Sequence, residues 1–415
     1  MTDAGGTTGR EPPAAVNRLS PLGFVLGFGV VSMFADVVYE GARAVIGPYL
    51  ATFGASAALV GLITGLGEAA ALVSRVFTGP LADRTGRYWP LSITGYLVTV
   101  VAVPALAAAG AFWQAALAVV GERFGKAVRT PARDTMLAQA STGVGRGRAF
   151  AYHEALDQAG ALIGPLLVAG MVALSGYRLG FAVLAVPGAA ALVALVLLRR
   201  AAPDPLAYSA PGGARAAQGA APPARWGAHW RGFSRAYWLY AAFTALSVGG
   251  YATFAVLAYH LEVRHIVAAA VIPLVYAVAM GVDALAALAF GHLYDRIGLR
   301  GLAAVPVLTA AIPFLSFSDR PALVWAGAAV WGAAMGVHES TMRAAVADLV
   351  PDARRGAGYG TFGAIYGLAW LVGSTVIGAL SSVSLGALDI LVVALQVASL
   401  AVLAVLFHSR GPKRP

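Results

Sequence analysis

Residues 79–87 read GPLADRTGR, and residues 291–299 read GHLYDRIGL. Gly, Leu, Asp, Arg and Gly recur at the same offsets, and the second segment starts 212 residues after the first. Both segments are polar turns that lie between long apolar stretches. A turn repeated at the same place in each half of the chain predicts two halves with the same topology in parallel register.

The apolar stretches around these turns are long enough to cross a membrane. A helix needs about 20 apolar residues to span a bilayer. Dividing the chain at its charged and turn-rich points gives twelve such stretches, at residues 20–46, 58–81, 89–110, 113–139, 149–174, 178–198, 236–261, 267–292, 300–317, 322–347, 357–380 and 386–407.

The composition agrees with a membrane protein. Of the 415 residues, 59% are hydrophobic and 12% are charged, whereas a typical soluble domain is about 25% charged. A soluble fold cannot bury so much apolar surface, which excludes a soluble enzyme and a nucleic-acid-binding protein. The sequence therefore predicts an all-α integral membrane protein with twelve transmembrane helices in two pseudo-symmetric six-helix bundles.

Polar segments divide the chain into five predicted parts. Residues 1–17 are small and polar and are expected to form a disordered tail. They lack the apolar region of a cleavable signal. Residues 18–198 and 236–408 are the two six-helix bundles. Residues 199–235 are rich in Ala, Pro, Gly and Arg and predict a flexible cytoplasmic linker. Residues 409–415 form a C-terminal tail.

The distribution of positive charge predicts the orientation. With the N-terminus inside, three arginines fall in outer loops, Arg178, Arg264 and Arg320. Nineteen basic residues fall in inner segments: Arg10, Arg18, Arg84, Arg87, Arg146, Arg148, Arg199, Arg200, Arg215, Arg225, Arg231, Arg235, Arg296, Arg300, Arg354, Arg355, Arg410, Lys413 and Arg414. The positive-inside rule then places both termini on the cytoplasmic side of the cytoplasmic membrane.

The repeated turn resembles a loop motif of the major facilitator superfamily, and the likeness covers the chain from about residue 20 to residue 408. The family carries G-x-x-x-D-R-x-G-R between its second and third helices. Here the matching residues are Gly79, Asp83, Arg84, Gly86 and Arg87, with Asp295 and Arg296 in the second copy. The resemblance implies a secondary transporter in which two halves rock around a site near the midplane.

A gating role is expected for this loop. Its arginines can pair with carboxylates or helix C-terminal carbonyls of the other half when the inner side is closed. A contact made in one state alone biases the equilibrium between two states. The alternative is a positive-inside turn without a switching role.

The fifth predicted span carries a second motif. Gly160, Gly164 and Pro165 resemble the G-x-x-x-G-P pattern that the same family associates with antiporters. The resemblance implies a drug-efflux-like antiporter.

Five ionisable residues lie within the first two predicted spans, where charge is costly and is by default a functional candidate. Counting inward from the outer turn places Asp36 level with Arg75, and Arg43 level with Glu68, so two ion pairs are expected. Glu40 has no evident partner. A membrane-embedded carboxylate of this kind can carry a proton near neutral pH, so proton coupling is assigned to Asp36, Glu40 and Glu68. The alternatives are a static structural network and direct contact with substrate.

The fourth predicted span carries a charged stripe of Glu122, Lys126, Arg129 and Arg133. These residues recur at helical spacing on one face. Arg129 and Arg133 can attract an anionic substrate or snorkel to the interface. Pairing with the carboxylates at the start of the next span is the alternative, and it is preferred for most of the stripe.

Further candidates are polar or aromatic residues of the other spans. The secondary polar candidates are Glu154, Asp157, Asp283, His338, Glu339 and Arg343, of which Glu339 and Arg343 can pair along one helix face. The aromatic candidates for a central cavity are Tyr39, Tyr251, Tyr276, Tyr366 and Trp370. Tyr39 is preferred because it neighbours the charges of the first span.

These features favour a secondary active transporter that exports a small organic compound in exchange for protons. The alternatives are uptake of an organic anion or a sugar by proton symport, metal-ion export and a membrane protein that transports nothing. No metal site or cofactor is expected, because cysteine is absent and His and carboxylates do not cluster. An ATP-driven pump is not expected, because no G-x-x-x-x-G-K-[ST] motif occurs. An intramembrane enzyme is not expected, because it would need catalytic acids or His clustered at one interface and would leave the duplicated loop motif unexplained. The expected partners are the substrate, protons and the lipid bilayer, without nucleic acid, and the expected functional unit is a monomer.

Overall fold

The computed structural model describes residues 17–208, 232–351 and 354–410, and these ranges contain helices and no β-strand. The first half comprises α1 (Pro21–Arg43), α2 (Ile46–Ala51), α3 (Ala57–Thr85), α4 (Tyr88–Ala105), η1 (Leu106–Ala108), α5 (Phe112–Ala140), η2 (Ser141–Gly143), α6 (Arg146–Val183), α7 (Ala185–Ala201) and η3 (Pro205–Tyr208). The second half comprises α9 (Arg235–Gly249), α10 (Phe254–Val263), η4 (Ala269–Val271), α11 (Ile272–Ile297), η5 (Gly298–Ala303), α12 (Ala304–Ser316), α13 (Pro321–Leu349), α14 (Arg355–Val383) and α15 (Leu385–Arg410).

These helices follow the predicted spans. Eight helical stretches of the described ranges are long and apolar enough to cross a membrane. Two of them, Gly147–Ala201 with 55 residues and Ala269–Ser316 with 48 residues, are long enough for two crossings each. The long helices α5 and α13 have 29 residues each. The all-helical architecture is thus confirmed, and it is consistent with twelve crossings.

Breaks inside the helices separate or shape individual spans. Ser175 and Gly176 leave the helical conformation within α6, with φ of 75° at Gly176, at the predicted boundary between the fifth and sixth spans. The first span of each half is also interrupted, between α1 and α2 and between α9 and α10. The predicted tails and linker lie mostly outside the described residues, which include only Asn17, 199–208, 232–235 and 409–410 of them.

The repeated turn ends a helix in both halves. Gly86 caps α3 with φ of 61°, and Gly298 follows α11 with φ of 60°. Only glycine adopts this left-handed region without a steric penalty. The tight turn expected at Gly86 is confirmed. We call the end of the molecule with these turns the inner end and the opposite end the outer end.

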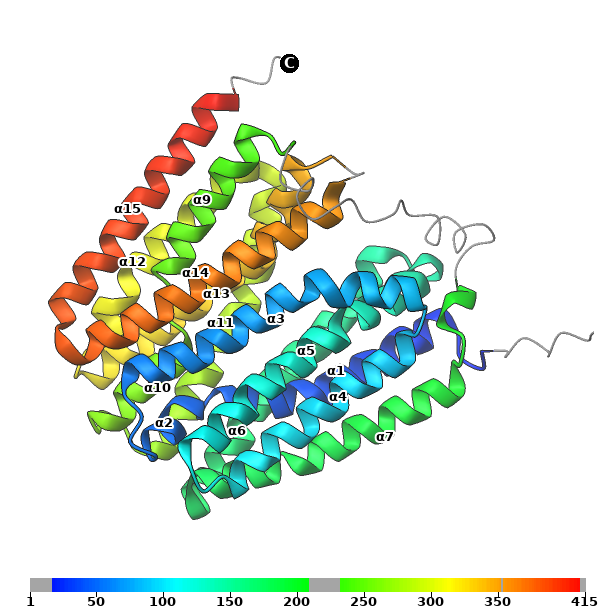
Figure 1. The fold of residues 1–415 in the computed structure, drawn as a ribbon, viewed down its shortest axis with the longest axis horizontal. Helices are drawn as coiled ribbons and strands as arrows, with labels where there is room; N and C mark the ends of the chain where they lie inside the picture. Colours follow the sequence, from blue (N-terminus) through cyan, green and yellow to red (C-terminus); the bar gives the residue numbers. More distant parts are fainter. Residues whose placement is uncertain (1–16, 209–231, 352–353, 411–415) are drawn as a thin grey trace, which may run out of the picture.

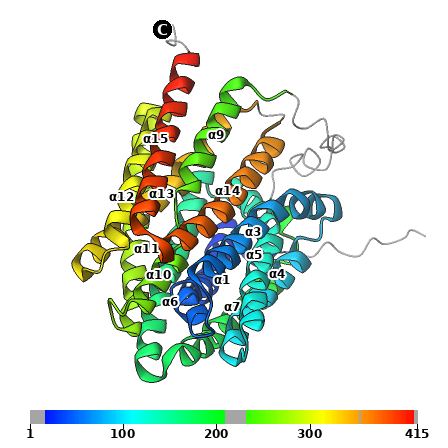
Figure 2. The same cartoon turned by 60° about the vertical axis from the view of Figure 1, so that its left-hand side comes forward.

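The two halves lie side by side along the whole molecule (Figures 1 and 2). Their main contacts are between α3 and α14, between α6 and α11, and between α2 and α10. Among the described residues, three hydrogen bonds join the halves: Tyr177 to Glu262 at 2.6 Å, Thr64 to Thr253 at 3.1 Å, and Tyr276 to Glu40. The first two lie toward the outer end.

Glycines bring the backbones of the two halves into direct contact at the outer end. A Cβ atom added at Gly47 of α2 would lie 1.9 Å from the carbonyl oxygen of Ala255 in α10. A Cβ atom at Gly61 of α3 would lie 2.1 Å from the carbonyl oxygen of Ser374 in α14. No larger residue fits at these places without a shift of the helices, so the outer end is closed in this structure.

The glycines of the second motif hold α6 against α1. A Cβ atom at Gly160 would lie 2.3 Å from the carbonyl oxygen of Met33, and one at Gly164 would lie 2.5 Å from that of Val37. Because these contacts flank Asp36, they fix the part of α1 that carries Asp36 and Glu40 against its neighbour.

Candidate functional site

A cluster of buried charges lies between α1, α3 and α5 of the first half and α11 of the second. We call it the central cluster, and its members are Tyr39, Glu40, Arg43, Glu68, Glu122, Arg123, Lys126 and Tyr276. The close packing of α3 and α5 against each other brings charges from separate helices together. Burying charges is tolerated only where they pair, and most of these do.

Glu68 of α3 is bound by two arginines. Its Oε1 atom lies 3.4 Å from Nη2 of Arg43 and 3.3 Å from Nη1 of Arg123. The predicted Arg43–Glu68 pair is therefore confirmed. Arg123 also pairs with its neighbour Glu122, whose Oε2 atom lies 3.3 Å from its Nε atom. Arg123 was not among the predicted site residues, because it lies one residue outside the charged stripe of α5.

Glu40 connects the two halves. Tyr276 of α11 donates a hydrogen bond to its carboxylate, and Nη1 of Arg43 lies 3.7 Å from its Oε1 atom. The expectation that Glu40 lacks a partner was wrong. Arg43 lies one turn further along the same helix, and Tyr276 belongs to the other half, 236 residues away.

Tyr39 forms an aromatic surface for three cations. Arg123 donates a hydrogen bond to its hydroxyl group and places its Cζ atom 4.3 Å from the ring centroid. Nζ of Lys126 lies 3.9 Å from the same centroid, and Cζ of Arg43 lies 5.8 Å away. The negative face of an aromatic ring attracts such cations, particularly where water is excluded.

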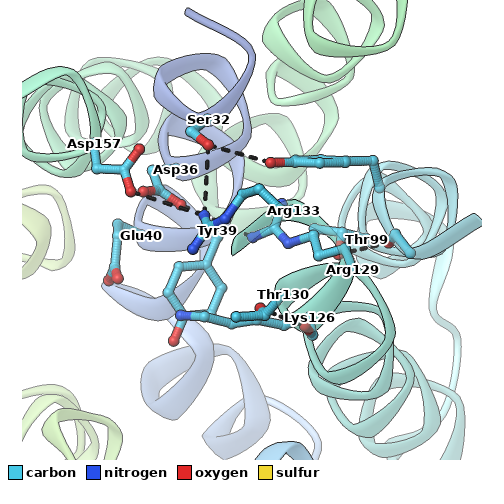
Figure 3. Close-up of polar contacts among 12 residues, drawn as sticks. Ser32, Asp36, Tyr39, Glu40, Thr99, Lys126, Arg129, Thr130, Arg133 and Asp157 are labelled. Atoms are coloured by element: carbon cyan, nitrogen blue, oxygen red, sulfur yellow. Dashed lines mark hydrogen bonds and ion pairs between the residues drawn. The ribbon is translucent and has the colours of Figure 1, made fainter. Parts of the chain in front are cut away.

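A second polar network lies on the inner side of the central cluster (Figure 3). Asp36 faces Nη2 of Arg129 at 4.0 Å, so the predicted pair with Arg75 is replaced by a pair with α5. Depth along the membrane, from which the pair with Arg75 was predicted, does not reveal which way each helix face turns. Arg129, which is 2% exposed, also stacks over Tyr96 at 4.4 Å.

The same network joins α5 to α6. Arg133 lies 3.9 Å from Asp157 and 3.0 Å from Asp134. His153 lies 3.4 Å from Asp157 through Nδ1 and contacts Ser32 through Nε2 at 3.0 Å. The alternative in which α5 pairs with carboxylates at the start of the next span is thus realised for Arg133.

The remaining candidates of the second half lie apart from these pairs. Asp283 and His338 are buried, at 3% and 2% exposure. His338 packs against Tyr251 and Tyr366, while Glu339 is exposed. The side chain of Arg343 lies outside the described residues. Glu154, from the first half, is exposed and accepts a hydrogen bond from Gln158 at 3.3 Å.

A small pocket opens beside the central cluster. It is lined by Arg43, Ile46, Thr64, Glu68, Arg123, Thr253 and Ala255, from both halves, and its volume is about 10 Å³. That volume holds about one water molecule. No group of three His, Cys, Asp or Glu residues with metal-binding geometry occurs in the described part of the chain.

The repeated loop is exposed at the inner end. Asp83, Arg84 and Arg87, like Asp295 and Arg296 of the second copy, make no ion pair with any other described residue. In this structure the loop therefore forms no ion pair with a described residue of the other half, and its gating role stays a prediction.

We expect Asp83→Asn to lower the maximal transport rate severalfold, while the affinity for substrate changes little. The loop lies far from the central cluster, and its loss affects the balance between states. Transport rates and binding of the same compound in the purified variant test this. An unchanged maximal transport rate would indicate that the loop only sets the orientation of the chain in the membrane.

Comparisons with known proteins agree on one family. A model described as Major Facilitator Superfamily matches residues 24–374 and 254–415. Uncharacterized proteins of Mycobacterium tuberculosis and Mycobacterium bovis are 48% identical over 401 residues, which cover 95% of this chain and 95% of theirs.

Solved structures share the fold at low sequence identity. A peptide transporter, POT, in complex with sulfate gives a TM-score of 0.75 at 15% identity, covering 95% of this chain and 96% of its own. A mutant of the nucleoside transporter NupG gives 0.74 at 14%, with 92% and 100% covered. A bacterial homolog of the lysosomal transporter Spinster, in an inward-facing and occupied conformation, gives 0.69 at 16%, with 93% and 95% covered. The chain thus belongs to the major facilitator superfamily.

Proposed function

We propose that the protein is a proton-coupled secondary transporter that moves a small organic compound by alternating access. The observation that carries the proposal is the bond between Glu40 of α1 and Tyr276 of α11. This carboxylate belongs to one half and is held by the other, at a buried position. Protonation of Glu40 removes a charge from this contact, and so shifts the balance between states that differ in how the halves meet.

Export is the first candidate direction. It rests on the likeness of Gly160, Gly164 and Pro165 to an antiporter motif, and their close packing against α1 beside Asp36 supports a role near the coupling site. The second half adds aromatic residues beside the cluster, where Trp370 lies near Arg43 and packs edge-to-face against Tyr251 and Tyr366. Such a lining suits amphipathic organic molecules.

Uptake of an organic anion by proton symport is the second candidate. Four cations on α5 favour it, since they follow one helix through both polar networks: Arg123, Lys126, Arg129 and Arg133. Figure 3 shows the last three of them. We propose further that the protein works as a monomer in the cytoplasmic membrane with both termini inside, as the asymmetry of positive charge supports.

Transport in proteoliposomes tests the function. We expect a pH gradient across vesicles that contain the purified full chain to drive flux of at least one organic compound from a chemically diverse panel. Export predicts that substrate and protons move in opposite directions, and symport predicts that they move together. A pH gradient that drives no flux of any compound, in a preparation that still binds one of them, would contradict proton coupling.

A further inference from the structure

Lys126 is unusual in this chain. Lysine and arginine together number 29, and Lys126 and Lys413 are the two lysines. Arginine therefore serves at almost every basic position, including all the others in the two buried networks. The ammonium group is a compact charge with three donors, whereas guanidinium is a planar fork suited to fixed carboxylate pairs. A lysine at this one position of the cluster points to a use other than a permanent ion pair.

The ammonium group of Lys126 has no carboxylate partner within the described part of the chain. Arg43, Arg123, Arg129 and Arg133 each lie within 4.0 Å of a carboxylate oxygen. Lys126 makes no such pair with any residue that the structure describes, and its Nζ atom lies over the ring of Tyr39 at 3.9 Å. Its side chain is half-buried.

A second cation on the same helix has unused donors. Arg129 follows Lys126 by three residues, which places both on one face of α5. Arg129 is 2% exposed, and its Nε and Nη1 atoms have no hydrogen-bond partner among the described residues. Buried donors without acceptors are costly. This turn of α5 therefore presents both uncompensated charge and spare hydrogen-bond donors, and an anionic oxygen satisfies both.

We propose that Lys126, beside Tyr39, docks a carboxylate group of the transported compound, with Arg129 available as a second donor. The inference rests on the proposed transport function and names the chemical class of its substrate, an organic monocarboxylate. The aromatic ring of Tyr39 holds the ammonium in place without neutralising it, so the charge stays available until the substrate arrives.

The docked anion also affects the nearby carboxylates. Glu40 and Asp36 are electrostatic neighbours of Lys126, and Figure 3 shows their side chains with that of Lys126 around Tyr39. An incoming carboxylate is repelled by both and attracted more strongly once Glu40 has lost its charge. Proton and substrate thus favour each other's binding, as the second candidate function, proton symport, requires.

Labelling of the amine tests the docking site directly. In a Lys413→Arg variant, Lys126 is the single lysine, so reductive methylation with formaldehyde and a borane, followed by peptide mass mapping, reports on Lys126 alone. Benzoate, octanoate and indole-3-acetate are the probes, and the corresponding amides are the neutral controls. A saturating carboxylate that binds here should slow methylation about tenfold or more, because occupied molecules do not react. The amides should leave the rate unchanged.

Thermal stabilisation of the full chain by the same probes shows whether their binding depends on the charge of residue 126 or only on apolar packing. Lys126→Gln should abolish the stabilisation by carboxylates, and Lys126→Arg should keep part of it. Glu40→Gln should strengthen it, because one repelling charge is gone. Arg200→Gln, an exposed cation at the end of α7, is the matched control and should change nothing.

The outcomes distinguish this inference from the transport function. Equal protection by carboxylates and amides, or none by either while a pH gradient still drives flux of some compound, would overturn the inference and leave proton-coupled transport standing. Protection by carboxylates without pH-driven flux would support the docking site and contradict the coupling.

Discussion

Replacing Glu40 with glutamine is expected to abolish transport driven by a pH gradient, while exchange of substrate across the membrane without a gradient continues. Glutamine keeps the size of the side chain and can still accept the hydrogen bond from Tyr276, so the contact between α1 and α11 is preserved. It cannot bind or release a proton. The equilibrium between the two states then no longer depends on pH, so the movement of substrate is uncoupled from that of protons.

Paired flux assays measure this effect. Vesicles with and without a pH gradient should accumulate the same amount of substrate in the Glu40→Gln variant, but not in the native protein. Asp36→Asn should give the same loss, because its half-buried carboxylate faces Arg129 and borders the same network. Asp389→Asn, on α15 and away from the cluster, is the control. Gradient-driven accumulation in both cluster variants would reject the assignment of coupling to these carboxylates.

Gly47→Val is expected to prevent closure of the outer end and to stop transport in either direction. The added side chain would meet the backbone of Ala255, where even a Cβ atom would lie 1.9 Å from the carbonyl oxygen. Overpacking of this kind costs about 1–3 kcal/mol or more. A penalty confined to the state closed at the outer end shifts the population toward the opposite state about 5- to 150-fold.

The absence of native cysteine makes that shift measurable. A single cysteine at Thr253, which is 4% exposed in the outer contact, should react slowly with a membrane-impermeant maleimide in the otherwise native chain. Gly47→Val should make it react quickly from the outer side. Gly170→Val is the matched control, because a Cβ atom at Gly170 meets nothing within 4 Å. Slow labelling in the Gly47 variant, with transport intact, would show that α2 and α10 need not close so tightly.

The succession of helices was predictable from sequence because it depends on the lengths of the apolar stretches. Apolar length located the spans, and glycine spacing located the turn at Gly86. Depth in the membrane was enough to pair Arg43 with Glu68, since α1 and α3 contribute these residues at one level. It failed for Asp36, whose partner depends on the rotation of α5 toward α1.

The contact between Glu40 and Tyr276 was beyond sequence reasoning for a different reason. It joins residues 236 positions apart, and nothing local to either residue reports how two separately packed halves meet. For the same reason, the sequence could not show that Lys126 makes no ion pair with a described residue. The stripe on α5 was recognised from its spacing, but which of its members lack a partner among the described residues depends on carboxylates supplied by α1, α3 and α6.

The glycine contacts between α3 and α14 have an evolutionary consequence. Backbone packed on backbone leaves no room for a side chain at Gly61, and Gly378 is similarly close to Ala57, at 2.3 Å for an added Cβ atom. A larger residue along this seam is therefore incompatible with the closed outer end, whereas the half-buried side chain of Lys126 can be exchanged without such a backbone clash. Substitution at Lys126 can therefore change the transported compound while the packing between the halves is kept, so transporters of one fold can move many different compounds.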